Sequence, residues 1–584
     1  MTRASSGPVQ KMRNAVCYRL MASGLYHWRL DRHAPTGLVF AAKDPWPGDP
    51  EIATELFHGT YAFAGEVHTS VGEPPWSFID PGVNGRAGDA WTEEALSFSW
   101  LRHFTAAGGA TAGRQARALI ETWIETYGIW HPLAWRPDLL ARRIVSWLSH
   151  STFFLDGADP EFKARWLASV SRQFRHLTRV ARHADVGERH MRALAGVVVG
   201  GLCLPGGRVH AEPARKKLLR EIERQVLADG GHVSRSPSAG LALTRDLVTV
   251  RGVLATANRD TPYLLQTALD RMGPMFGLLR HGDQRLALFN GGYEESAAEI
   301  DTILGLADAR GAALFNAPHS GFQRLAAGDI VVIADAGAPP PARFSGNAHA
   351  GTASFEMSIG PHRMIVNCGA GGCAPQPQGE GEGQGENIDR GEDWVAASRA
   401  TAAHSTLVVD DTSSSRFRRR GRKRGQIFNG PEQVSAAREE ADGSIWLDIE
   451  HDGFARKFGV LHRRRLYLEN PGTDLRGEDV ITKSTTGKRG TPSPSGNLPL
   501  SIHFHLHPDV RASLSQDGGS IVLRLPDGDG WKFRASGGTL SLVESVYFGE
   551  RGRVRRTEQI VIAGTVEFGE AVVKWALRRI RGGG

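Results

Sequence analysis

Cysteine is scarce in this sequence, and so are long apolar segments. Four cysteines in 584 residues, at irregular spacings, exclude a disulfide framework of the kind that stabilises small secreted domains. No segment approaches the 18 or more apolar residues of a membrane-spanning helix, so we expect no transmembrane segment. The N-terminal region lacks a clean apolar core followed by small residues, so no cleavable export signal is predicted.

The chain does contain enough apolar surface for a folded protein of more than one domain. Hydrophobic residues make up 41% of the sequence, including 14 Trp and 24 Phe, which argues against extended disorder. A chain of 584 residues exceeds the size of one ordinary core, so two or more domains are expected. The net charge of +7 predicts attraction to a polyanion. Acidic glycans, nucleic acids and anionic membranes are all possible partners of this kind.

Two different periodicities divide the chain. Across residues 91–304 apolar positions recur every three or four residues, which predicts a succession of helices paired around an axis. From about residue 315, short β-rich segments alternate with Gly, Asp and Pro turns, which is typical of an antiparallel sandwich. The predicted fold class is therefore α+β and multidomain, with a helical domain followed by a C-terminal antiparallel β-sandwich.

The same patterns give approximate domain boundaries. We expect an N-terminal extension over residues 1–45, a helical domain over 46–312 and a β-sandwich domain over 313–584. Within the sandwich, residues 371–392 are rich in Gly, Gln and Glu and are expected to form a mobile insertion, because such a composition cannot pack.

Residues 416–425 (RFRRRGRKRG) form the densest cluster of charge. An exposed hairpin tip, a polyanion site and a nucleic-acid patch are all open interpretations. Phe417 is the only aromatic residue in the run, and no motif typical of nucleic-acid recognition accompanies it. We therefore expect no nucleic-acid partner.

Several segments, in order along the chain, resemble the heparinase II/III family of polysaccharide lyases. They are ARRIVSWLSH at 141–150, DGGHVSRSPS at 229–238, AHAGTASFEMS at 348–358, HRMIVNCG at 362–369, SRATAAHSTLVVDD at 398–411 and HRRRLYL at 462–468. The resemblance covers roughly residues 45–575. It implies an (α/α) toroid of helices followed by a β-sandwich, and an acidic, uronate-containing polysaccharide as substrate.

The resemblance also implies a reaction. Such lyases remove the proton at C5 of a uronic acid and expel the 4-linked sugar, which requires a base, an acid and a clamp for the carboxylate. The candidate catalytic residues are His190, Tyr293, His349 and His404. The candidate substrate-binding residues are Arg189, His232, Arg235, Asn347 and Arg399, since arginine suits bidentate contacts with carboxylates and sulfates.

The sequence departs from the family pattern at three central places. Ala239 stands where a tyrosine follows the SPS segment, and the usual His-x-His-x-Asp pattern is replaced by Asn347, His349 and Gly351. These departures keep two functions open: a lyase that cleaves acidic polysaccharide by β-elimination, and a catalytically degenerate glycan-binding protein of the cell envelope.

No cofactor is required by either function. In some family members histidines at the positions of His349 and His404 help to hold a structural zinc, but Asn367 stands near the position of the acidic third ligand, so weak or no metal binding is expected. The family suggests the bacterial envelope or periplasm, whereas the absence of a clear export signal leaves the cytoplasm open. The sequence does not indicate the oligomeric state.

Overall fold

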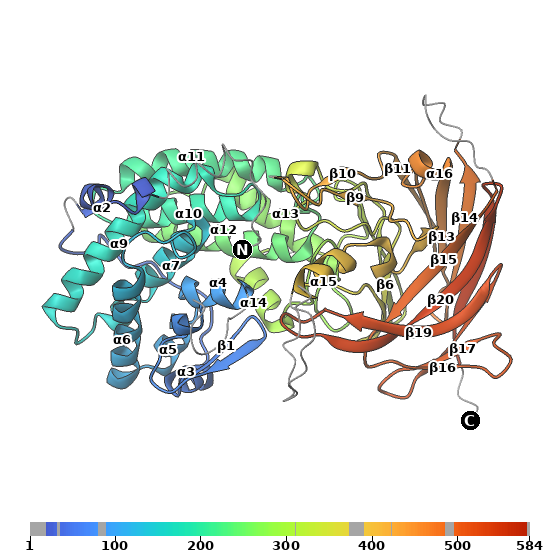
Figure 1. Ribbon diagram of the computed structural model, residues 1–584, viewed down its shortest axis with the longest axis horizontal. Coiled ribbons are helices and arrows are strands. Elements are labelled where there is room, and N and C mark those ends of the chain that lie inside the picture. Colours follow the sequence, from blue (N-terminus) through green and yellow to red (C-terminus); the bar gives the residue numbers. More distant parts are fainter. Residues whose placement is uncertain are drawn as a thin grey trace. The chain divides into compact units, whose positions relative to one another are not determined.

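The computed structural model describes residues 19–31, 35–79, 89–309, 311–372, 390–421, 423–484 and 496–580. The chain forms two compact units, each assembled from three separate stretches (Figure 1). Unit 1 comprises Met1–Gln225, Ala242–Leu269 and Thr302–Asp308, and unit 2 comprises Val226–Leu241, Asp270–Asp301 and Ala309–Gly584. Most of the expected insertion (373–389), and residues 1–18 and 32–34 of the expected extension, lie outside the described residues.

Unit 1 is helical, as the periodicity predicts. One short hairpin, β1 (Thr60–Phe63) with β2 (Glu66–Thr69), was not predicted. The helices are α2 (Gly24–Asp31), α3 (Pro50–Phe57), α4 (Asp89–Ser97), α5 (Leu101–Ala107), α6 (Gly109–Tyr127), α7 (Pro137–Ser149), α8 (Ser151–Phe154), α9 (Pro160–Val180), α10 (Glu188–Cys203) and α11 (Arg208–Gln225). Helices α12 (Pro237–Thr256), α13 (Tyr263–Leu279) and α14 (Ala297–Ala307) are shared between the two units.

Local sequence explains how these helices begin and how closely they pack. Pro137 and Pro160 occupy the first positions of α7 and α9, where a missing N–H costs nothing, and Asp159 caps α9 by accepting from the Phe162 N–H at 2.7 Å. Gly196 of α10 faces α7 so closely that a Cβ there would lie 2.5 Å from the Cβ of Ala141. Among the described residues, no helix is both long enough and apolar enough to cross a bilayer.

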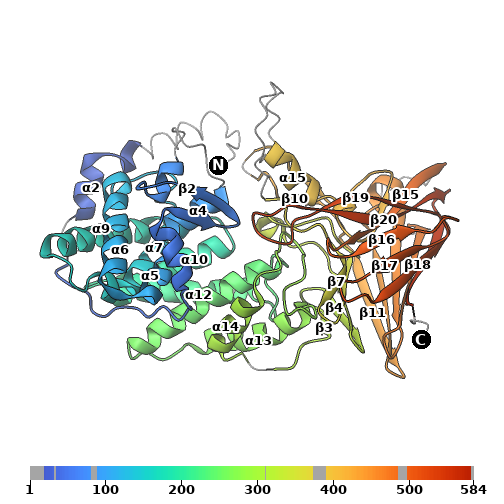
Figure 2. The same ribbon diagram turned by 90° about the horizontal axis from the view of Figure 1, so that it is seen from below.

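Unit 2 contains two antiparallel sheets (Figure 2). An eight-stranded sheet has the order β11-β12-β13-β14-β21-β18-β17-β16. Its strands are β11 (Val434–Ala441), β12 (Ser444–His451), β13 (Val460–Leu468), β14 (Asp474–Lys483), β16 (Arg511–Leu514), β17 (Ile521–Arg524), β18 (Gly530–Ser536) and β21 (Ala571–Arg579).

The second sheet has the order β19-β20-β15-β7-β6-β5-β4-β3, with β8 also paired to β15. Its strands are β3 (Asn316–Ala317), β4 (Phe322–Ala327), β5 (Ile330–Asp335), β6 (Phe355–Ile359), β7 (His362–Val366), β8 (Leu407–Val409), β15 (Asn497–Leu506), β19 (Thr539–Tyr547) and β20 (Arg555–Glu567). Outside the sheets, β9 (Arg416–Phe417) pairs with β10 (Ile427–Asn429), and α15 (Arg390–Ser398) and α16 (Ala455–Phe458) are two short helices.

The inner faces of the two sheets share one apolar core. Strand β13 alternates buried and partly exposed residues along its whole length, as expected for a strand with one face in the core. Trp575 of one sheet stacks on Phe355 of the other, with ring centroids 5.7 Å apart, and meets Phe504 at 4.9 Å. The predicted order of a helical domain followed by an antiparallel sandwich is therefore confirmed.

A buried charged network crosses this core. Arg464 of β13 and Asp479 of β14 are fully buried and form two hydrogen bonds of 2.8 and 3.0 Å, while His462 bonds to the same carboxylate at 2.8 Å. Arg464 also donates to the carbonyls of Ala353 and Ser405. Because these carbonyls belong to the segments that follow His349 and His404, the network fixes both segments from inside the core.

Candidate functional site

Two of the expected site residues, His349 and His404, are brought together in unit 2. They come from the segments that precede β6 and β8, and both are buried. His349 Nδ1 and His404 Nε2 lie 3.1 Å apart, and the rings meet edge to face. Sequence reasoning therefore selected a pair that is in direct contact.

The hydrogen bonds of this pair define its protonation. His404 Nδ1 lies 2.8 Å from the Ala400 carbonyl, which can only accept, so Nδ1 carries the hydrogen. Burial lowers the pKa of His404 to about 4 and that of His349 well below its ordinary value, so both rings are neutral near pH 7. His349 Nδ1 therefore donates to His404 Nε2, and His349 Nε2 is left as an acceptor.

Asn290 connects this histidine pair to Arg235. Its side-chain amide donates to the Arg235 carbonyl at 3.1 Å, and its amide oxygen accepts from the His349 N–H at 3.1 Å. Asn290 and Arg235 both have positive φ, 49° and 59°, which is a conformation that asparagine tolerates better than most residues. Sequence reasoning missed Asn290, although the glycine pair that follows it marks an irregular turn.

Arg235, expected to bind substrate, has its guanidinium engaged inside unit 2. It forms an ion pair with Asp335 at 2.5 Å, donates to the Ser320 carbonyl at 2.6 Å and lies over the Phe322 ring. The neighbouring His232 is also buried, with Nδ1 2.6 Å from Ser234 Oγ, and burial lowers its pKa to about 4. The Arg235 side chain therefore holds the start of α12 against β4 and β5.

Arg399 is likewise engaged with the backbone. It donates to the carbonyls of Ala348, Ser345 and Gly425, and its guanidinium lies 4.0 Å from the centre of the Phe417 ring. Burial lowers its pKa to about 10. The contacts with residues 345 and 348 position the segment that carries Asn347 and His349, and Asn347 itself is exposed.

Packing explains one of the departures from the family pattern. A Cβ at Gly351 would lie 2.7 Å from His404 Cδ2, so an acidic side chain at this position would displace that ring. Ala239, where a tyrosine is expected, is buried in α12.

Tyr293 lies in the loop that also carries Asn290. It is half-buried, its N–H donates to Ser238 Oγ at 2.9 Å, and the Arg551 guanidinium lies 4.3 Å from the centre of its ring. The next residue, Glu294, anchors the loop to the sandwich. It pairs with Arg285 at 2.6 Å and accepts from the Tyr547 hydroxyl, and its N–H donates to the Gly549 carbonyl.

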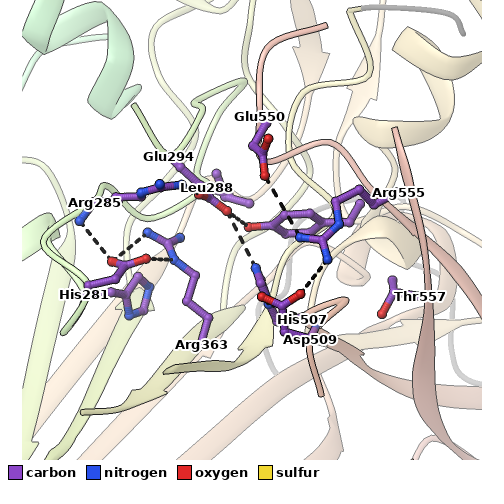
Figure 3. Close-up of polar contacts among 12 residues, drawn as sticks. His281, Arg285, Leu288, Glu294, Arg363, His507, Asp509, Glu550, Arg555 and Thr557 are labelled. Carbon is purple, nitrogen blue, oxygen red and sulfur yellow. Dashed lines mark hydrogen bonds and ion pairs between the residues drawn. The ribbon is translucent and has the colours of Figure 1, made fainter. Parts of the chain in front are cut away.

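Figure 3 shows that this anchor extends through a chain of polar contacts. His507 lies 3.8 Å from Glu294 and 3.5 Å from Asp509, which pairs in turn with Arg555 at 2.5 Å. Burial alone would raise the pKa of Glu294, but bonds from His507 and Tyr547 and the nearby Arg363 charge hold it well below its ordinary value.

A second, deeper part of the anchor surrounds Glu356 on β6. His281 lies 3.0 Å from this carboxylate, which also accepts from the N–H groups of Leu288 and Asn367. Sequence reasoning missed these charges, because their partners are 11 to 75 residues away along the chain. Together the two parts hold residues 281–294, and with them Asn290 and Tyr293, on the sandwich.

The other two expected site residues, Arg189 and His190, belong to unit 1. Both lie in the first turn of α10. Arg189 pairs with Glu93 at 3.2 Å and with Asp185 at 3.5 Å, and burial lowers the pKa of the half-buried His190, opposed by Glu221. The roles of all nine expected site residues stay predictions.

The surroundings of His349 and His404 do not fit a structural zinc. Such a site takes four ligands, usually Cys, His or carboxylate. Within the described residues, no group of three or more His, Cys, Asp or Glu side chains could hold a metal. Asn367, near the third expected position, accepts from the Ser405 N–H at 3.0 Å and donates to the Leu288 carbonyl, so its amide is already used.

Residues 309–576 match the family model described as Heparinase II/III-like, C-terminal. FtsZ-localized protein C of Caulobacter vibrioides (strain NA1000 / CB15N) is 32% identical over 569 residues, which covers 96% of this chain and 93% of that protein.

Solved structures extend the likeness over nearly the whole chain. Heparinase III is 13% identical with a TM-score of 0.67, covering 98% of this chain and 92% of that one. A mutant of the heparan sulfate lyase HepC from Pedobacter heparinus is 15% identical with a TM-score of 0.60, covering 99% and 92%. At these identities the comparison establishes a shared fold, a helical toroid followed by an antiparallel β-sandwich.

Proposed function

The chain belongs to the heparinase II/III-like family. We propose that it is a glycan-binding protein with a polysaccharide-lyase fold that does not carry out ordinary β-elimination. We also propose that it localises with FtsZ. The main support for a loss of β-elimination is that the guanidinium groups of Arg235 and Arg399 already have internal hydrogen-bond partners. Each already donates to an internal carboxylate or to backbone carbonyls. A sugar carboxylate would have to displace those partners, which is costly because breaking a buried pair leaves an uncompensated charge.

The missing groups support the same proposal. An eliminase needs an acid for the leaving oxygen, and Ala239 supplies none where the family has a phenol. Loss of one group that stabilises the transition state typically costs about a hundredfold or more in rate. The combined departures at Ala239, Asn347 and Gly351 therefore favour binding over turnover.

An assay of lyase activity on purified protein tests whether β-elimination is lost. Alginate and heparan sulfate are incubated with the full chain, and unsaturated uronate is followed by its ultraviolet absorbance, with heparinase III as the positive control. We expect no release above the background without protein. Sustained release that disappears in the His349→Ala variant would contradict the proposal.

The cellular part of the proposal rests on the relative whose name states localisation with FtsZ, since that protein matches 96% of this chain. A fluorescently tagged chain is expected to coincide with tagged FtsZ and to disperse when FtsZ is depleted, whereas the tag alone does neither. A distribution that ignores FtsZ depletion counts against this localisation. Fractionation of the same cells tests the envelope or periplasmic location that the family resemblance implies.

A second candidate function is residual elimination on an acidic, uronate-containing polysaccharide. It is favoured by the available acceptor on His349 Nε2, which is the atom that a general base needs. In this version Tyr293 serves in proton transfer and Arg235 holds the carboxylate. Activity in the assay above that falls more than tenfold in both the His349→Ala and Tyr293→Phe variants would select it.

A further inference from the structure

The outer face of the eight-stranded sheet carries a groove of about 440 Å³ that takes no part in the site described above. Its lining comes from four adjacent strands, β13, β14, β21 and β18. A volume of this size lies within the range of about 300–1,000 Å³ that is usual for ligand clefts.

The strand register explains why the groove exists. Tyr467 is opposite Arg476, Arg476 is opposite Ala576, and Ala576 is opposite Arg534, so these four outward side chains form one row across the sheet. Strands are about 4.8 Å apart, which places the Arg476 and Arg534 backbones roughly 10 Å from one another. The small Ala576 between two long arginines leaves a depression.

A second row adds charge. Arg465 is opposite Glu478, and Glu478 is opposite Lys574. The groove is thus lined by four cationic side chains and one carboxylate. Glu478 is shared by Lys574 at 3.2 Å and Arg465 at 3.7 Å, so it neutralises only part of this charge.

Two arginines are placed to receive an anion. Asp474 holds Arg476 through bonds of 2.8 and 2.7 Å, which fixes its direction in advance of binding. Arg534 is exposed and, within the described part of the chain, forms no hydrogen bond or ion pair. An anionic ligand can therefore gain contacts with Arg534 without first breaking an internal pair.

The lining also includes Gly477, Ala535, Trp575 and Ala576. The aliphatic stems of the cations add apolar surface, since long charged side chains can lay their methylene groups along a protein surface. Arg476 lies 5.5 Å from the centre of the Tyr467 ring, and Trp446 packs against the same ring at 4.7 Å. A sugar or a base that stacked on this ring would therefore have to compete with Arg476.

We propose that this groove binds an acidic peptide segment of a protein partner, with alternating carboxylate and apolar side chains. In an extended peptide, residues two apart are about 6.8 Å from each other, which matches the distance between the two rows. Carboxylates two residues apart then face the two rows, one between Arg476 and Arg534 over Ala576 and the next toward Lys574, while the apolar side chains between them point away from the sheet. A polysaccharide would need many neutral hydrogen-bonding groups, and of these the lining supplies mainly the Ser536 and Tyr467 hydroxyls.

The test uses the full chain and a fluorescent synthetic peptide that alternates Glu with Ala and has a central Phe. Binding is followed by fluorescence anisotropy. Arg534→Ser combined with Arg476→Ser is expected to weaken binding at least tenfold, and Ala576→Leu, which fills the groove, to weaken it similarly. Arg524→Ser, an exposed arginine on β17 outside the lining, is the matched control and is expected to leave affinity unchanged.

Several results would overturn the assignment. They are no binding of the peptide by the unaltered chain, unchanged affinity in both groove variants, or equal binding of the peptide with Gln in place of Glu. Tighter binding of a heparan sulfate fragment or of oligo-dT than of the peptide would show a different ligand class. The FtsZ localisation is a separate claim: if the groove variants still coincide with FtsZ while peptide binding fails, only the groove assignment falls.

Discussion

At the scale of single residues, the buried pair of Arg235 and Asp335 makes a direct prediction about stability. Asp335→Asn would leave the Arg235 guanidinium buried without its counter-charge, and breaking such a pair costs about 3–5 kcal/mol. The solvent-accessible pairs of the partly exposed Asp448 with Arg463 and Arg465 provide the control, since Asp448→Asn is expected to cost under about 1 kcal/mol. Urea unfolding of the two variants measures both, and equal midpoints would refute the distinction.

A buried histidine gives a prediction about pH. Burial lowers the pKa of His505 to about 3 from an ordinary value near 6.5, so the folded chain keeps this ring neutral while the unfolded chain protonates it. The stabilisation is complete above pH 6.5 and is lost as pH falls, by about 2 kcal/mol at pH 5. His505→Gln is expected to flatten the decline in unfolding free energy between pH 7 and pH 5.

The exposed His319 in the same unit is the control for this experiment. His319→Gln is expected to leave the slope of the unaltered chain unchanged. If both variants show the same pH dependence as the unaltered chain, His505 does not contribute to acid sensitivity.

The residue scale also shows what the sequence could and could not disclose. The family motifs led to His349 and His404, which are in contact. No sequence pattern pairs Arg235 with Asp335, because the two residues are 100 positions apart. The sequence therefore could not show that the Arg235 guanidinium already has an internal partner. Asn290 was missed for the same reason, since its role is to bridge two backbone groups from distant segments.

At the scale of elements, the sequence predicted most of the helices and the change to strands. Apolar periodicity is a local signal, and so is a proline in the first turn of a helix. Helix α7 begins at Pro137 and α9 begins at Pro160. The β1–β2 hairpin was missed because each strand has only four residues, too few to establish alternation. The order of strands within the two sheets depends on contacts between distant segments and was not predicted.

Replacement of two glycines by alanine, one in a strand and one in a helix, is expected to change the stability of the fold in opposite directions. A Cβ at Gly477 of β14 would lie 2.0 Å from the Trp575 ring, so Gly477→Ala is expected to destabilise by about 1–3 kcal/mol through overpacking. Gly252 of α12 is exposed and has open space at its Cβ position, so Gly252→Ala is expected to stabilise by about 0.5–1 kcal/mol. Thermal unfolding compares them, and a stabilised Gly477→Ala variant would contradict the packing argument.

At the scale of the whole molecule, the units are not continuous in sequence. Unit 2 includes Val226–Leu241 and Asp270–Asp301, both before the expected domain boundary at residue 312. These stretches supply the partners of three buried charges in the sandwich: Arg235 for Asp335, His281 for Glu356 and Asp283 for Arg363. The expected boundary stays a prediction. It was placed where the apolar periodicity changes, and periodicity indicates secondary structure but does not indicate which segments pack together.

This arrangement predicts different behaviour for two fragments of the chain. A fragment of residues 313–584 lacks the partners of Asp335, Glu356 and Arg363, and each buried charge left unpaired costs several kcal/mol, comparable to the stability of a whole domain. We expect it to show no cooperative thermal transition. A fragment of residues 226–584 retains all three partners and is expected to unfold cooperatively. Equal melting temperatures for the two would mean that the sandwich does not depend on these pairs.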